Sequence, residues 1–94
     1  MPLEGNITKS VLKYLNDLPS CVAEKVSGTS DSSGRADING CWNGRSFRIE
    51  MKSPDHGNST SKKQDINLMR WSHAGALCIV CYSLEEVKHY IPMR

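Results

Sequence analysis

RADINGCWNGRSFRIEMK, residues 35–52, has the pattern of two β-strands joined by a tight turn. Asn43-Gly44 lies at its centre and is the dipeptide that best satisfies the positive φ angles of a two-residue hairpin turn. The flanking residues are rich in β-branched, aromatic and alternating polar types, which predicts strands over Arg35–Trp42 and Ser46–Lys52. Asp37 and Glu50 are therefore expected on neighbouring strands of one hairpin.

The second of these strands separates apolar from charged side chains. Successive residues of a strand point to opposite faces of the sheet. One face is apolar and is predicted to be core: Phe47, Ile49 and Met51. The other face is charged and is available for chemistry: Arg48, Glu50 and Lys52.

The remaining residues alternate between helical and extended patterns. Apolar residues at spacings of three and four predict a first helix over residues 7–18, closed by Pro19. The other predicted elements are a short strand over Cys21–Val26, a helix over Lys62–His73, a buried strand over Ala76–Tyr82 and a last helix from the Ser83 capping box to Tyr90. The apolar positions of the helix over Lys62–His73 are expected at Ile66, Leu68 and Met69. The order α-β-β-β-α-β-α predicts one α/β domain that spans residues 1–94, with a mixed central sheet flanked by helices.

Length and composition limit the function classes. The chain has 94 residues, of which 38% are hydrophobic and 23% charged, and its formal net charge is +2. No apolar stretch approaches the roughly 20 residues of a membrane span, and no secretion signal is visible, so we expect no membrane association and a cytoplasmic protein of a bacterial or phage-infected cell. The four cysteines are expected to be reduced thiols. A domain this small gains stability from a bound metal, a nucleic acid or a second copy, and we expect a homodimer.

Asp37, Glu50 and Lys52 form the constellation that points to chemistry. Carboxylate oxygens are the ligands that Mg²⁺ prefers, and an ammonium beside the metal can orient an attacking water and stabilise charge on a phosphate. The alternative is that Glu50 and Lys52 belong to the solvated face of an edge strand. The surrounding residues favour the catalytic interpretation, because a Gly-rich loop precedes Asp37, Pro54 follows Lys52 and Gln64 opens the next helix.

These residues resemble the virus-type replication-repair nuclease (VRR-Nuc) domain of the PD-(D/E)XK superfamily over nearly the whole chain. The matching segments are Gly34-Arg35-Ala36-Asp37-Ile38, Gly44, Ile49-Glu50-Met51-Lys52-Ser53-Pro54 and Ser61-Lys62-Lys63-Gln64. The family usually has a proline where Ala36 stands. The resemblance implies a restriction-endonuclease-like fold and an Mg²⁺- or Mn²⁺-dependent endodeoxyribonuclease.

The resemblance also implies roles for individual residues. Asp37, Glu50 and the main-chain carbonyl of Met51 would bind the metal, and Glu4 on the first helix would join them. Lys52 would position the nucleophile, and Gln64 would support the site. Glu4 has a simpler explanation as well, because an acidic residue near a helix N-terminus complements the helix dipole.

Standalone members of this family resemble Holliday-junction resolvases that act as homodimers, so branched DNA is the expected partner. The basic residues are scattered as phosphate contacts would be, without a recognition-helix cluster: Lys9, Lys13, Arg35, Arg45, Lys62, Lys63, Arg70 and Lys88. Three alternatives stay open. They are a flap or duplex nuclease of the same fold, a module that binds branched DNA without cutting it, and a structural subunit of a larger complex.

Two weaker signals favour structural roles. Cys78-x-x-Cys81 lies in a predicted buried strand, where residues three apart point to opposite faces, so we expect core thiols rather than a zinc site. Trp42 and Trp71 could stack on exposed bases, although each equally suits a core or a dimer interface, and we favour the interface.

Overall fold

The structure, a computed structural model, describes residues 4–26, 37–52 and 62–93. The predicted order of elements is confirmed, including the short first strand. The elements are α1 (Glu4–Asp17), β1 (Cys21–Lys25), β2 (Ile38–Trp42), β3 (Arg45–Met51), α2 (Lys62–His73), β4 (Leu77–Cys81) and α3 (Leu84–Tyr90). None of the helices in this part of the chain is long and apolar enough to cross a membrane.

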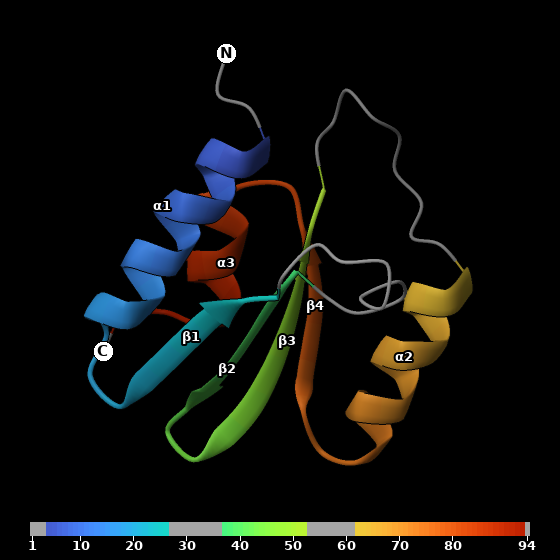
Figure 1. The fold of residues 1–94 in the computed structure, drawn as a ribbon. Helices are drawn as coiled ribbons and strands as arrows, with labels where there is room; N and C mark the ends of the chain where they lie inside the picture. The colour runs from blue at the N-terminus through green and yellow to red at the C-terminus, as the bar shows by residue number, and fades with distance from the viewer. Residues whose placement is uncertain (1–3, 27–36, 53–61, 94) are drawn as a thin grey trace.

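The strands form one mixed sheet in the order β1-β2-β3-β4. β1, β2 and β3 are antiparallel neighbours, whereas β3 and β4 are parallel. Figure 1 shows α1 and α3 side by side on one face of the sheet and α2 on the opposite side. Asn43 and Gly44 join β2 to β3 with φ angles of 52° and 84°, as the hairpin turn requires. The sequence prediction of an α/β domain with a mixed sheet is therefore confirmed.

The core lies between the sheet and the pair α1 and α3. Phe47, Ile49 and Met51 of β3 are fully buried there, as their alternation predicted. They pack in one cluster with Val11 and Leu15 of α1, among others. Burial of side chains of this size contributes about 1.5–3 kcal/mol each, so this face of β3 fixes the register of the whole strand.

Gly40 is required by the packing of the hairpin. It pairs with Phe47 across β2 and β3. A Cβ atom at this position would lie 2.2 Å from Cζ of the Phe47 ring and 2.5 Å from the main-chain oxygen of Val22. Only glycine lets the large ring lie across β2, so this residue sets how closely β1, β2 and β3 can pack.

Helix α2 differs from expectation. Its apolar positions were predicted at Ile66, Leu68 and Met69, yet Ile66 is 51% and Met69 59% exposed. No described residue of α2 is fully buried. The reason is that α2 packs against β4, on the side of the sheet to which the charged residues of β3 point. Polar residues such as Gln64 and Asn67 are therefore half-buried beside Leu68.

Strand β2 begins later than expected. The first strand of the hairpin was predicted from Arg35, but β2 begins at Ile38 and Asp37 forms a bend immediately before it. Arg35 and Ala36 lie outside the described residues. At the other end of the chain, Ser83 caps α3 as predicted, because its side chain accepts a hydrogen bond from the main-chain N–H of Glu86.

Candidate active site

Asp37 and Glu50 are brought together by the register of the hairpin. Ile38 of β2 pairs with Ile49 of β3, so the next residue outward on each strand, Asp37 or Glu50, lies opposite the other. The main-chain oxygen of Asp37 accepts a hydrogen bond from the N–H of Val26 at 2.8 Å. Its carboxylate oxygen Oδ2 accepts one from the N–H of Met51, also at 2.8 Å. These two hydrogen bonds fix Asp37 to Val26, directly after β1, and to Met51 of β3, although Asp37 itself lies just before β2.

Glu50 is a buried carboxylate with an unused oxygen. The residue is 4% exposed, on the face of β3 that α2 covers. Its Oε2 lies 3.4 Å from the Nζ atom of Lys52. Within the described part of the chain, its Oε1 is buried and has no hydrogen-bond partner. Leaving a charged oxygen buried and unpaired is costly, and natural structures rarely do so without a functional reason.

Lys52 is held from three directions. Its main-chain N–H donates to the carbonyl of Cys81 at 2.8 Å, which ties the end of β3 to β4. Its Nζ atom contacts Glu50 and donates to Oε1 of Gln64 at 3.3 Å. Gln64 comes from the first turn of α2, so the helix and the strand together orient the ammonium group. The side chain keeps 19% of its surface exposed, enough to reach a ligand.

The electrostatics of Glu50 follow from this burial. Its pKa is raised from an ordinary 4.5 to about 7, chiefly because burial disfavours the charged form and also because the Asp37 carboxylate is near. The Lys52 ammonium and a hydrogen bond with Gln64 act in the opposite direction, and they do not outweigh the first two causes. The buried Glu50 carboxylate and the half-buried Asp37 carboxylate repel each other, and a cation would stabilise this pair.

The donor set fits a hard divalent cation. Oε1 of Glu50 and the second carboxylate oxygen of Asp37 are oxygen ligands of the kind that Mg²⁺ and Mn²⁺ take. The hydrogen bond from Met51 to Asp37 places the main chain of Met51 at the same point, so its carbonyl is a further candidate ligand. Among the described residues no group of three His, Cys, Asp or Glu could hold a metal ion. Asp37 and Glu50 are two such residues, and the side chain of Glu4 lies outside those described.

Comparisons with protein-family models, with curated proteins and with solved structures find no match. The geometry of the chain itself therefore carries the functional argument. Of the segments that define the sequence motif, Asp37-Ile38, Gly44, Ile49–Lys52 and Lys62–Gln64 are described, whereas Gly34–Ala36, Ser53-Pro54 and Ser61 are not.

Arg48 and Trp71 extend this charged face away from Glu50. The guanidinium carbon of Arg48 lies 3.7 Å from the centre of the Trp71 ring. Sequence reasoning assigned Trp71 to an interface or a base-stacking role and gave Arg48 no role. The alternation along β3 predicted Arg48 on the face of Glu50, and Trp71 follows Gln64 by two helical turns, but the contact between Arg48 and Trp71 was not predicted.

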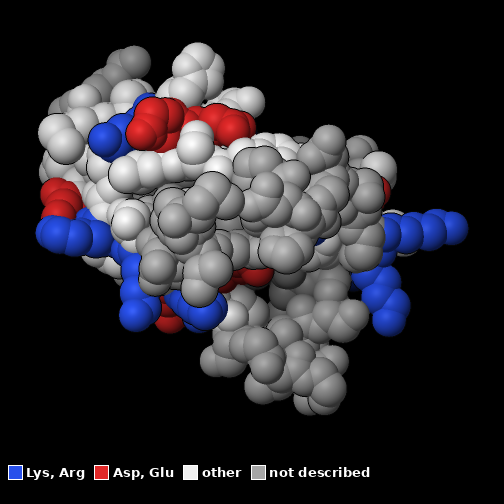
Figure 2. Space-filling view, turned by 90° about the horizontal axis from the view of Figure 1, so that it is seen from above, with Lys and Arg blue, Asp and Glu red and all other residues white. Residues whose placement is uncertain are grey.

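The surface around the site carries charges of both signs. Figure 2 looks onto the end of the molecule at which β3 ends. Lys and Arg side chains of the described residues stand at several margins of this face, with Asp and Glu side chains among them, and neither sign forms a continuous field (Figure 2). This distribution of the described charges matches the small net charge of +2.

Proposed function

We propose that this protein is a metal-dependent endonuclease with a restriction-endonuclease-like PD-(D/E)XK fold that hydrolyses DNA phosphodiester bonds. The observation that carries the proposal is the buried Glu50 carboxylate, whose Oε1 atom has no partner in the described residues and whose neighbours are Asp37 and Lys52. A bound cation would offset both the burial of Glu50 and its repulsion by Asp37. The order of elements and the mixed sheet support the fold assignment.

Each residue of the candidate site has a separate role in the proposed hydrolysis. Asp37, Glu50 and the carbonyl of Met51 would hold the ion, and Glu4 would be a further ligand as the resemblance of the sequence to the nuclease family implies. A bound Mg²⁺ or Mn²⁺ polarises the phosphoryl oxygen and acidifies a water. Lys52, held by Gln64, orients the attacking water and stabilises the charge that develops on the phosphate.

Branched DNA cut by a homodimer is the substrate and assembly that we propose. The basic side chains of the described residues are scattered and form no base-reading cluster among themselves, which suits contacts with phosphates and recognition by shape. The outer side of α2 exposes Ile66 and Met69, and apolar side chains of this size on a small domain suit a contact with a second copy. The setting that we propose is DNA processing in the cytoplasm of a bacterial or phage-infected cell.

The test of the chemistry is a cleavage assay of the purified protein on a labelled four-way junction, a flap and a linear duplex. Each substrate is incubated with Mg²⁺, Mn²⁺ or EDTA. Symmetric, metal-dependent cuts restricted to the junction are the expected result. Cleavage of the flap or duplex would support the proposed nuclease activity but contradict the proposed substrate. Binding without cleavage of any substrate would contradict the nuclease activity and favour a module that binds branched DNA.

Lys52→Ala and Lys25→Ala make a matched pair of variants for this assay. Lys25 is an exposed lysine at the end of β1, on the opposite face of the sheet from Glu50, so its loss should leave cleavage unchanged. Lys52→Ala should retain DNA binding and lose cleavage by about 100-fold or more, the usual effect of removing one group that stabilises the transition state. An active Lys52→Ala protein would remove Lys52 from the catalytic centre.

A further inference from the structure

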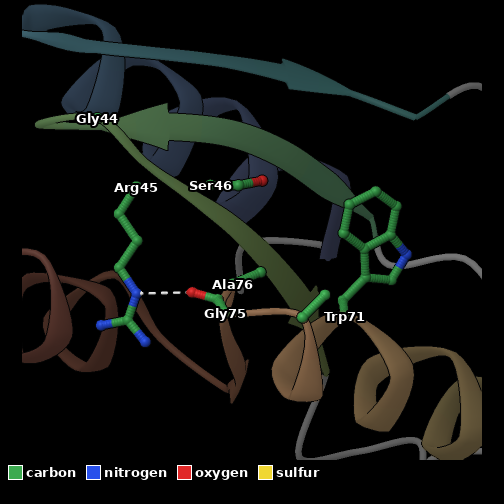
Figure 3. A pocket seen from close by; sticks show the side chains of 7 residues that line it. Gly44, Arg45, Ser46, Trp71, Gly75 and Ala76 are labelled. Atoms are coloured by element: carbon green, nitrogen blue, oxygen red, sulfur yellow. Dashed lines mark hydrogen bonds between the residues drawn. The ribbon is translucent and has the colours of Figure 1, made fainter.

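A pocket lies between the β2–β3 turn and the C-terminal end of α2, apart from the carboxylates. Its volume is about 330 Å³, and Arg45, Ser46, Trp71 and Gly75 are among its lining residues. Figure 3 shows Arg45 and Trp71 at opposite ends of the pocket, with the small residues between them. Ser46 and Glu50 share one face of β3 and are four residues apart, about 13 Å along the strand. The pocket and the candidate active site therefore belong to one continuous face.

Trp71 is fixed at one end of the pocket. The guanidinium group of Arg48 lies against its ring at 3.7 Å from the ring centre. Arg48 is itself held, because it donates to Oγ of Ser46 at 2.9 Å and to the carbonyl of Phe47 at 2.7 Å. Trp71 nevertheless stays 40% exposed. Arg48 therefore orients the Trp71 ring, and the exposed part of the ring can contact a ligand.

Arg45 supplies a positive charge at the other end. Its Nε atom donates to the carbonyl of Gly75 at 3.1 Å, as the dashed line in Figure 3 marks. That bond uses one donor of a side chain that has five, and the terminal nitrogens have no protein partner in the part of the chain that the structure describes. Among the described residues that line the pocket, none is acidic. The pocket is therefore suited to an anion that also carries an aromatic plane.

We propose that this pocket binds one unpaired nucleotide of a DNA strand, with its base stacked on Trp71 and its phosphate at Arg45. Stacking on an aromatic ring and a contact from arginine to phosphate are the two interactions by which proteins hold single-stranded nucleic acid. A distance of about 13 Å corresponds to roughly four base-pair steps of 3.4 Å. The inference rests on the proposed function and makes it specific, because it requires the branched substrate to open at the branch point and present an unpaired nucleotide a few positions from the bond that is cut.

Tryptophan fluorescence tests the pocket without any cleavage. The chain has two tryptophans, so Trp42→Phe leaves Trp71 as the only one. This protein is titrated in EDTA with a short single-stranded oligothymidylate and with the same strand made abasic. Quenching by the first strand and little by the second is expected. In the chain that keeps both tryptophans, Trp71→Leu should weaken binding about tenfold, within the range known for loss of one stacked base.

Matched variants separate the pocket from general effects. Tyr90→Leu removes another exposed aromatic and Lys25→Ala another exposed cation, and both should bind like the unchanged protein. Trp71→Phe keeps an aromatic face and should restore most of the affinity even if Trp71→Leu folds poorly. Arg45→Ala should weaken binding of the normal and the abasic strand by a similar factor, because Arg45 contacts phosphate.

Several results would overturn the inference. These are an absence of quenching, an equal loss in Tyr90→Leu and Trp71→Leu, or an equal dependence on Trp71 when heparin, a polyanion without bases, replaces the oligonucleotide. The nuclease proposal fails separately. Metal-dependent cleavage without quenching would remove only the pocket, and quenching without cleavage would remove only the nuclease.

Discussion

Glu50→Gln should make the protein more stable, and the gain should grow with pH. In the folded protein the pKa of Glu50 is about 7, against an ordinary value of 4.5. The folded state therefore binds this proton more tightly than the unfolded state, and folding loses stability as pH rises from 4.5 through 7. One pH unit corresponds to about 1.4 kcal/mol, so the charged carboxylate costs about 3 kcal/mol above pH 7. Glutamine has the same shape and no charge to bury.

The assay is unfolding by urea and by heat of both proteins in EDTA, across pH 4.5 to 8. The free energy of unfolding of Glu50→Gln minus that of the parent should rise by about 3 kcal/mol over this range. For a domain of this size the difference in Tm should rise by more than about 10 °C. Loss of the contact with Lys52 lowers the stability of the variant by a constant amount, so the slope with pH is the quantity to measure. Glu24→Gln, at an exposed carboxylate of β1, is the control.

Divalent cations complete this test. At pH 8, Mn²⁺ should raise the Tm of the parent protein and leave that of Glu50→Gln nearly unchanged, because a cation offsets only a charge that is present. A difference in stability that stays flat between pH 4.5 and 8 would show that Glu50 is not a buried charge. It would thereby remove the observation on which the proposed nuclease depends.

Three further variants test the fold and the site. Gly40→Ala should destabilise the protein by about 2 kcal/mol or more in urea, because its Cβ meets the Phe47 ring and a main-chain oxygen, and a loss below about 0.5 kcal/mol would contradict the packing. Ser83→Ala should cost about 1 kcal/mol through loss of the α3 cap, and an unchanged urea midpoint would count against that cap. Asp37→Asn should keep its stability, since the amide oxygen still accepts from Met51, and should lose Mn²⁺ affinity in calorimetric titration; unchanged affinity would exclude Asp37 as a ligand.

The hairpin was predictable because local chemistry determines it. Asn43-Gly44 specifies the turn, and the alternation from Phe47 to Met51 specifies which face is buried. These signals act over neighbouring residues and need no knowledge of the rest of the chain. Since the turn fixes the register, the juxtaposition of Asp37 and Glu50 followed from sequence as well.

The arrangement of α2 was less predictable, because it depends on what the helix packs against. Apolar residues usually mark the buried side of a helix, and Ile66 and Met69 were assigned to it on that basis. The helix instead covers a charged strand face, where Gln64 contacts Lys52 and Trp71 stacks on Arg48. Pairings between a helix and a distant strand depend on the tertiary contact, which periodicity alone does not contain.

The candidate active site lowers the free energy of unfolding of the protein. A domain of this kind is stable by about 5–15 kcal/mol in total, and the Glu50 charge costs about 3 kcal/mol of it above pH 7. Lys52 is close enough to compensate, yet it contacts only one of the two carboxylate oxygens and shares its ammonium with Gln64. A surface ion pair would turn both groups to water, and a purely structural core would place a neutral side chain at this position. A buried charge that its neighbours only partly compensate is instead what a cation-binding catalytic centre requires, since the ion supplies the missing partner when it binds.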